Sequence, residues 1–191
     1  MKKLSLYIFL VLMWCNVGFA DDVSDFEIDG ISIGDSLLRH MSEEDITKNI
    51  TDVYYYIDDK KFIVSGFITN NVSSRYGVIQ VTFKKNDDKY IIYGVGGVIN
   101  PISSSECLLK RQEVEKNINN LFKNYEKSGP DIVKHPVDQT GKSIVNQISF
   151  ELDGGVVLIE CYDFSEQVSY PDSFMISAYS KELNEWLQKY Q

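Results

Sequence analysis

The side chains whose types could act together on a ligand are His135, Asp138, Lys142 and Asp163. The first three lie in one polar stretch, residues 134–142, and Asp163 follows a β-type run further along the chain. A histidine near a carboxylate can move protons at neutral pH because its pKa lies close to that range. The grouping makes this stretch a candidate ligand site, and an ordinary polar loop is the alternative interpretation.

Two short matches to catalytic motifs lack the sequence context that their chemistry requires. Residues 30–34 (GISIG) match the nucleophile elbow around Ser32, but no buried strand pattern precedes them. Residues 141–143 (GKS) match the end of a phosphate-binding loop, but Pro136 stands where the first glycine is needed. A strand pattern also follows, whereas phosphate binding requires a helix N-terminus. Neither motif therefore predicts a catalytic residue.

The sequence offers no ligand set for a metal ion or a cofactor. The two histidines, His40 and His135, have no partner at a metal-ligand spacing. The paired aspartates fall at the expected mature terminus and in turn-like stretches, where aspartate is favoured for local reasons. We therefore expect no metal, no cofactor and no catalytic residue, and the sequence favours binding over catalysis.

The first twenty residues have the three parts of an export signal. Lys2 and Lys3 precede an apolar run over residues 4–15, and Gly18 and Ala20 supply small side chains before the expected cleavage point after Ala20. The protein is therefore expected in the periplasm or outside the cell. An uncleaved anchor and a lipoprotein acylated at Cys15 are the alternatives, the latter disfavoured because bulky Trp14 precedes that cysteine.

The chain is acidic, with 19 basic and 28 acidic residues and a formal net charge of -9. Removal of residues 1–20, which hold two lysines and no acid, deepens this charge to -11. Such a surface repels phosphate groups, which disfavours nucleic acids and anionic membrane surfaces as partners. An unknown protein or small molecule of the envelope remains as the expected partner.

Cleavage of the signal would leave two cysteines, Cys107 and Cys161. Cys107 falls on the apolar stripe of an expected helix, and Cys161 shares a strand face with Val157 and Ile159. Both point toward one core, so we predict a disulfide between them, with two separate buried thiols as the alternative. In the chain-entropy model the closed loop contributes about 4 kcal/mol.

Hydrophobic periodicity predicts an α+β fold with mostly antiparallel sheet. The expected order is a helix, about four strands, a long helix, three strands and a C-terminal helix. The expected helices cover residues 35–49 (one or two short helices), 103–128 and 181–191, and the expected strands cover residues 53–57, 61–69, 75–83, 89–99, 143–152, 156–162 and 173–179.

Local signals fix several of these boundaries. Ser103 and Glu106 form a capping box at the start of the long helix, and the stretch 128–130 (SGP) is expected to end it. Residues 153–155 (DGG) predict a tight hairpin turn. No linker divides residues 21–191, so one domain is expected, with two packed halves (21–102 and 103–191) as the alternative.

The chain resembles a family of small exported proteins from marine bacteria with AT-rich genomes. The resemblance rests on residues 26–38 (FEIDGISIGDSLL), 140–143 (TGKS), 161–165 (CYDFS) and 184–187 (NEWL). It implies export and carries no activity, ligand or catalytic residue onto this chain. The opening segment is also similar to the small outer-membrane assembly lipoproteins, whose lipid-bearing cysteine this chain lacks.

These observations lead to one leading hypothesis and one alternative. The leading hypothesis is an exported, non-enzymatic binding or interaction protein of the cell envelope, with the aromatic residues of stretch 54–56 as possible partner contacts. The alternative is a small extracytoplasmic hydrolase or isomerase that uses the loop of residues 134–142.

Overall fold

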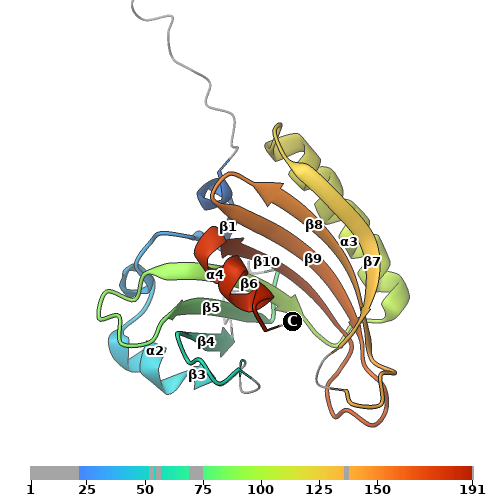
Figure 1. The fold of residues 1–191 in the computed structure, drawn as a ribbon, viewed down its shortest axis with the longest axis horizontal. Helices are drawn as coiled ribbons and strands as arrows, with labels where there is room; N and C mark the ends of the chain where they lie inside the picture. The colour runs from blue at the N-terminus through green and yellow to red at the C-terminus, as the bar shows by residue number, and fades with distance from the viewer. Residues whose placement is uncertain (1–21, 52–53, 55–56, 69–74, 136–137, 191) are drawn as a thin grey trace, which may run out of the picture.

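An eight-stranded antiparallel sheet with helices on both faces forms the body of the protein (Figure 1). The computed structural model describes residues 22–51, 54, 57–68, 75–135 and 138–190. Its elements are η1 (Val23–Asp25), β1 (Glu27–Ile28), β2 (Ile31–Ser32), η2 (Leu37–Arg39), α2 (Glu43–Lys48), β3 (Ile50–Thr51), β4 (Phe62–Ile68), β5 (Val78–Lys84), β6 (Ile92–Ile99), α3 (Ser104–Leu121), β7 (Glu126–Lys134), β8 (Ile144–Leu152), β9 (Gly155–Asp163), β10 (Ser173–Ser180) and α4 (Lys181–Gln188).

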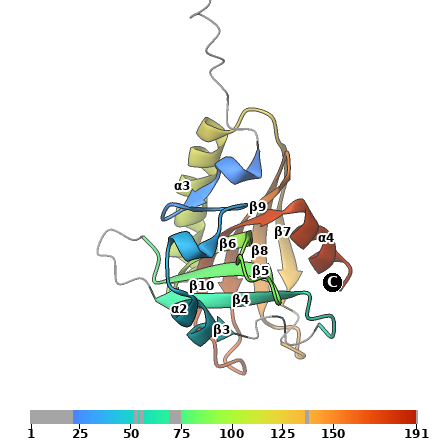
Figure 2. The ribbon, with the colours of Figure 1, turned by 90° about the vertical axis from the view of Figure 1, so that its left-hand side faces the viewer.

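The large sheet has the strand order β3-β4-β5-β6-β10-β9-β8-β7, and β1 and β2 form a separate two-stranded hairpin. Strands β6 and β10 pair at its centre, so one sheet runs through residues 21–102 and 103–191. The sheet twists strongly: in Figure 2 β4 runs across the view, whereas β7 and β8 run nearly vertically. Within the described residues, no helix is long and apolar enough to span a membrane.

The two faces of the sheet are covered differently, and we name them after the helices that lie on them. On the α3 face, α3 packs against β9 and β10, and Ser65 on β4 donates a hydrogen bond to the Ile46 carbonyl of α2 (3.1 Å). On the α4 face, Leu183 and Trp186 of α4 pack with Tyr54 and Phe62. The described elements therefore build two cores, one on each side of the sheet.

The predicted disulfide is confirmed and joins the longest helix to the centre of the sheet. Cys107 on α3 and Cys161 on β9 are bonded, with 5.9 Å between their Cα atoms and 54 positions between them in sequence. Both side chains are buried in the α3-face core. The cross-link therefore holds α3 against the strand that lies between β8 and β10.

The predicted α+β class and mostly antiparallel sheet are confirmed, but the predicted element order is wrong in two places. The hairpin β1–β2 precedes the first α-helix, and β7 occupies residues expected to be helix end and loop. The helix α3 ends at Leu121, where Phe122 takes an extended conformation and is buried. The SGP stretch lies inside β7 at a register shift, which an edge strand tolerates because its outer side makes no ladder bonds.

The remaining boundaries agree closely with the sequence patterns. The capping box of Ser103 and Glu106 starts α3, and the turn after β8 places Gly154 at φ 77°, a conformation that favours glycine. The predicted strand over residues 53–57 falls mostly outside the described residues, and β4 pairs instead with β3. Within the aromatic stretch 54–56, Tyr54 is buried, and residues 55–56 lie outside the described residues, as does the expected signal peptide, residues 1–20.

Candidate functional site

Asp138, one of the predicted ligand-site residues, is the hub of a hydrogen-bonded loop. Its carboxylate accepts hydrogen bonds from the Thr140 backbone and hydroxyl (2.9 and 2.6 Å) and from the Ser143 backbone and hydroxyl (2.8 and 2.7 Å). The Ser165 hydroxyl donates a fifth (2.8 Å). These bonds hold the pKa of Asp138 well below its usual range. The arrangement supports a structural role, because the carboxylate oxygens are already engaged.

His135 lies in an aromatic cluster, which we define as His135, Tyr162, Phe164 and Tyr170. The centroid of its ring lies 5.0 Å from that of Phe164 and 5.6 Å from that of Tyr162, both in edge-on geometry. The Tyr162 and Phe164 rings stack with 5.7 Å between their centroids. Burial lowers the pKa of His135, and the nearby Asp138 carboxylate offsets part of that effect. Tyr170, which packs on Phe164, is 56 % exposed, so the cluster reaches the surface.

The other two predicted ligand-site residues do not join this cluster through any interaction described. Lys142 is exposed in the turn before β8. Asp163 is exposed at the end of β9, where it accepts a long hydrogen bond from the Ser104 hydroxyl of α3 (3.4 Å). The structure thus brings His135 close to Asp138 and leaves Lys142 and Asp163 at the surface.

The two motif-like stretches serve the fold locally. Ser32 lies on β2 and is buried beside the turn of Asp29 and Gly30, so it does not stand at a strand-to-helix elbow. In the GKS stretch, Gly141 occupies a turn with φ 68° and Ser143 binds Asp138. The stretch leads into β8, in agreement with the sequence interpretation.

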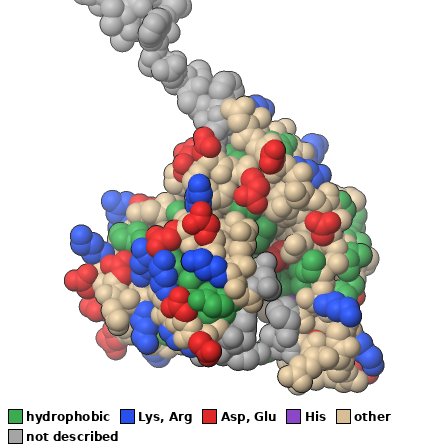
Figure 3. Space-filling view, viewed as in Figure 1, with side chains coloured by type: hydrophobic (Ala, Val, Ile, Leu, Met, Phe, Trp, Pro, Cys, Tyr) green, Lys and Arg blue, Asp and Glu red, His purple; other side chains and the backbone are tan. Residues whose placement is uncertain are grey.

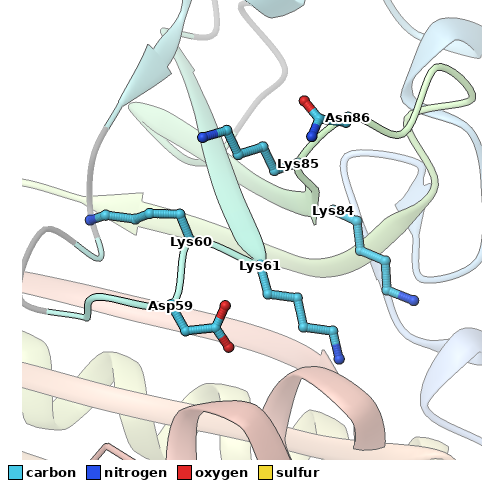
Figure 4. A pocket seen from close by; sticks show the side chains of 6 residues that line it. All are labelled: Asp59, Lys60, Lys61, Lys84, Lys85 and Asn86. Atoms are coloured by element: carbon cyan, nitrogen blue, oxygen red, sulfur yellow. The ribbon is translucent and has the colours of Figure 1, made fainter.

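A surface pocket near α4 is lined by four lysines (Figure 4). Some of these lysines form ion pairs with the helix. Lys61 and Lys84 both contact the Glu182 carboxylate of α4, at 2.8 and 3.0 Å. Lys60 donates to the Tyr54 carbonyl (3.0 Å). Three of the four cations therefore already bind oxygen atoms of the protein, which explains their clustering without a ligand.

The α4 face is hollowed beyond α4, toward the loops at the far ends of β7–β10 (Figure 3). Strand pairing places Gln147, Glu160, Met175 and Val98 in one row across β8, β9, β10 and β6. The next row toward α4 contains Ser149, Leu158, Ser177 and Gly96. We call these two rows the hollow of the α4 face.

Glu160 is the charged residue at the centre of this hollow. It is only 8 % exposed, and burial raises its pKa to about 7 despite a hydrogen bond from the Tyr162 side chain. A carboxyl group with such a pKa exists in both charge states near neutral pH. Glu160 can therefore donate a hydrogen bond when protonated and attract a cation when ionised.

Ser177 is a diagonal neighbour of Glu160 on the adjacent strand, because Ser177 pairs with Leu158 and Met175 pairs with Glu160. The Ser177 side chain is completely buried, and its hydroxyl has no hydrogen-bond partner. Buried hydroxyl groups are almost always bonded in folded proteins. The hollow thus holds an unused donor and acceptor one strand away from a titratable carboxyl and diagonal to it.

Neither Glu160 nor Ser177 was among the candidates drawn from the sequence. The signal for Glu160 was a single charge inside the apolar run of residues 156–161, in a strand that the structure shows buried on both faces. Ser177 carries no comparable signal, because a serine between Ile176 and Ala178 is compatible with any half-buried strand. Only the strand register brings the two residues together.

Aromatic and polar groups thus follow one another from one end of the sheet toward its centre. The aromatic cluster lies at the rim, its member Tyr162 bonds to Glu160, and Ser177 lies on the neighbouring strand. Such a combination of apolar walls and few polar groups is typical of small-molecule sites. Comparisons of the chain with protein-family models, with curated proteins and with solved structures found no match.

Proposed function

We propose that this is an exported, non-enzymatic binding protein of the cell envelope that holds a small molecule in the hollow of the α4 face. The observation that carries the proposal is the buried, unpartnered hydroxyl of Ser177 beside Glu160. A ligand that displaces the side chains covering Ser177 and bonds to this hydroxyl would restore the hydrogen bonding that the fold alone leaves unmade.

The energetic argument is that Ser177 is costly unless it serves a ligand. A buried hydroxyl without a partner destabilises a fold by about 1–3 kcal/mol relative to a satisfied one. Alanine would fit the same strand position, as it does next along the chain at Ala178. Residues that reduce stability without a structural benefit are typical of functional sites.

The rest of the hollow fits a ligand with an apolar body and one polar group. Leu158 and Met175 are half-buried and flank the Ser177–Glu160 pair, and Val98 lies on the other side of Met175. Apolar contacts supply affinity, while the two polar groups fix orientation.

Export is supported by the disulfide, because such bonds persist in oxidising compartments. A binding role is favoured over the alternative of a hydrolase in the 134–142 loop, because the Asp138 carboxylate is occupied by five hydrogen bonds. The mass of the exported protein tests the location, with a mature N-terminus at Asp21 as the expected result.

Ligand-observed NMR with a library of small neutral and charged fragments tests the binding site. We expect fragments that bind the exported wild-type protein and lose binding in Ser177→Ala and Glu160→Gln. Exposed controls of the same chemistry, Ser24→Ala and Glu166→Gln, should bind as the wild type does. Ser177→Ala is a clean variant because removal of an unpaired hydroxyl should not reduce stability.

The proposal fails if no fragment responds to either substitution in the hollow. It also fails if a fragment is chemically converted over time and His135→Ala abolishes the conversion, since that result would support the hydrolase alternative.

A further inference from the structure

Four of the five acidic side chains of β7–β10 lie on one face of the sheet, and the fifth, Asp163 at the end of β9, lies on the other. Register places Glu126, Asp131, Glu151 and Glu160 on the α4 face. The lysines of the same strands, Lys127 and Lys134, fall on the α3 face. Within these four strands the described α4 face therefore contains four carboxyl groups and no lysine or arginine.

Two of these carboxyl groups lie directly opposite each other on neighbouring strands. Glu126 on β7 is the cross-strand partner of Glu151 on β8. Burial raises the pKa of Glu151, and the Glu126 charge raises it further. Like charges directly opposite on neighbouring strands destabilise a sheet. The pair lies two rows along the sheet from Glu160 and adds to the negative charge of this face.

From this placement of carboxyl groups on the α4 face we infer that the ligand is an organic cation with a primary or secondary ammonium group. The inference rests on the proposed function. The ammonium group donates to the Glu160 carboxylate and to the Ser177 hydroxyl, which lie diagonally adjacent. Its apolar body lies along Leu158 and Met175 toward the aromatic cluster, where rings attract cations and apolar groups alike.

Other ligand classes fit the same residues less well. A neutral polyol could bond to protonated Glu160 and to Ser177, but it would not use the unbalanced charge of the face. An anion would be repelled by all four carboxyl groups. Within the described residues, no group of three or more His, Cys, Asp or Glu side chains could hold a metal ion.

Binding of a cation to Glu160 is coupled to loss of its proton. The groups that could perturb this titration are Tyr162 and His135 at the rim and Asp131 in the same row, while Gln147 and Met175 beside Glu160 are neutral. The charged residues of α4, which packs further along β9, are Lys181, Glu182, Glu185 and Lys189, and Glu182 is bound by Lys61 and Lys84.

Calorimetric titration of the exported protein tests the inference with three ammonium probes: n-hexylammonium, 2-phenylethylammonium and cyclohexylmethylammonium. Each is compared with the alcohol that carries a hydroxyl in place of the ammonium group. We expect at least one ammonium probe to bind more than about tenfold tighter than its alcohol, as a desolvated charge pair should. Because only ionised Glu160 binds the cation, affinity should fall roughly thirty-fold from pH 8 to pH 5.5.

The variants separate Glu160 from other titrating groups. Glu160→Gln should weaken ammonium binding and remove its pH dependence, whereas Glu166→Gln and His135→Gln should retain that dependence. Ser177→Ala should weaken binding and also retain the dependence.

The inference is overturned if the alcohols bind as tightly as the ammonium probes, if affinity does not change with pH, or if no ammonium probe binds. Alcohol binding that Ser177→Ala abolishes would reject the cation while leaving the proposed function intact. A fragment screen without any ligand for the hollow would reject both.

Discussion

The indole N–H of Trp186 donates a 3.0 Å hydrogen bond to the Asp59 carboxylate, across 127 positions of sequence. Trp186 is 2 % exposed and its ring meets Tyr54 and Phe62 edge-on, each at 5.3 Å. Trp186 thus anchors the C-terminal helix α4 to the segment before β4, and the exposed Tyr190 adds a longer hydrogen bond to the same carboxylate (3.3 Å). The position of α4 in turn sets one boundary of the hollow that we propose as the ligand site.

Replacement of Trp186 should weaken the packing of α4 against the sheet. Trp186→Ala is expected to lower the free energy of unfolding by about 3–5 kcal/mol, because it removes a large buried ring and leaves a cavity. Tyr190→Ala, which truncates a ring that is 41 % exposed on the same helix, should cost far less. Urea unfolding followed by circular dichroism measures both free energies; equal losses would contradict the anchor role.

The disulfide should contribute most of its stabilisation through the unfolded chain. Replacement of both Cys107 and Cys161 by serine is expected to lower the free energy of unfolding by about 4 kcal/mol in the chain-entropy model for a loop of this length. The comparison is made by denaturant unfolding of the exported wild type and the double variant without reductant. A difference near zero would show that α3 is held by its packing alone.

The hydrogen bonds to Asp138 should make the loop before β8 sensitive to acid. Because the pKa of Asp138 is lowered in the fold, its contribution is present above the usual aspartate range and is lost as the pH falls through the folded-state value. Asp138→Ala should therefore lower the thermal midpoint at neutral pH, with a smaller difference from the wild type in strong acid. The exposed Lys142→Ala serves as control, and amide exchange at Ser143 and Ser165 reports the loop directly.

Glu160 should produce the opposite pH dependence. Burial raises its folded-state pKa to about 7, so between the ordinary glutamate range and that value the folded protein binds more protons than the unfolded chain. This group therefore reduces stability as the pH rises, by about 2–3 kcal/mol between pH 5 and pH 8. Glu160→Gln removes this loss. The free energy of unfolding of the variant, measured by urea titration, should therefore rise relative to that of the wild type as the pH increases over that interval. If the free energies of unfolding of the two proteins changed in parallel with pH, Glu160 would not be a buried carboxyl with a raised pKa.

Local sequence signals predicted the elements that depend on neighbouring residues. The Ser103–Glu106 capping box, the DGG turn and the strand patterns around it describe α3, β8 and β9 closely, because their causes lie within a few positions. The cysteine pair was also predictable, since helix and strand periodicities each placed one thiol on a core face.

Strand β7 shows where such signals fail. Its nine residues, Glu126–Lys134, are all exposed and include Gly129 and Pro130, which locally favour a helix end and a turn. They form a strand because β8 offers an unpaired edge, and the register shift between Ser128 and Asp131 accommodates the proline. The strand is thus a consequence of its partner rather than of its own composition.

The sequence by itself determined the α+β class, the capped long helix, the pairing of Cys107 with Cys161 and the acidic charge of the chain, because each follows from composition or local periodicity. Only the tertiary structure decided which polar side chains share a surface. Asp138 became a saturated structural hub, while Glu160 and Ser177, 17 positions apart and on different strands, became neighbours. The reason is that register between strands is set by the packing of whole faces, which no short stretch of sequence encodes.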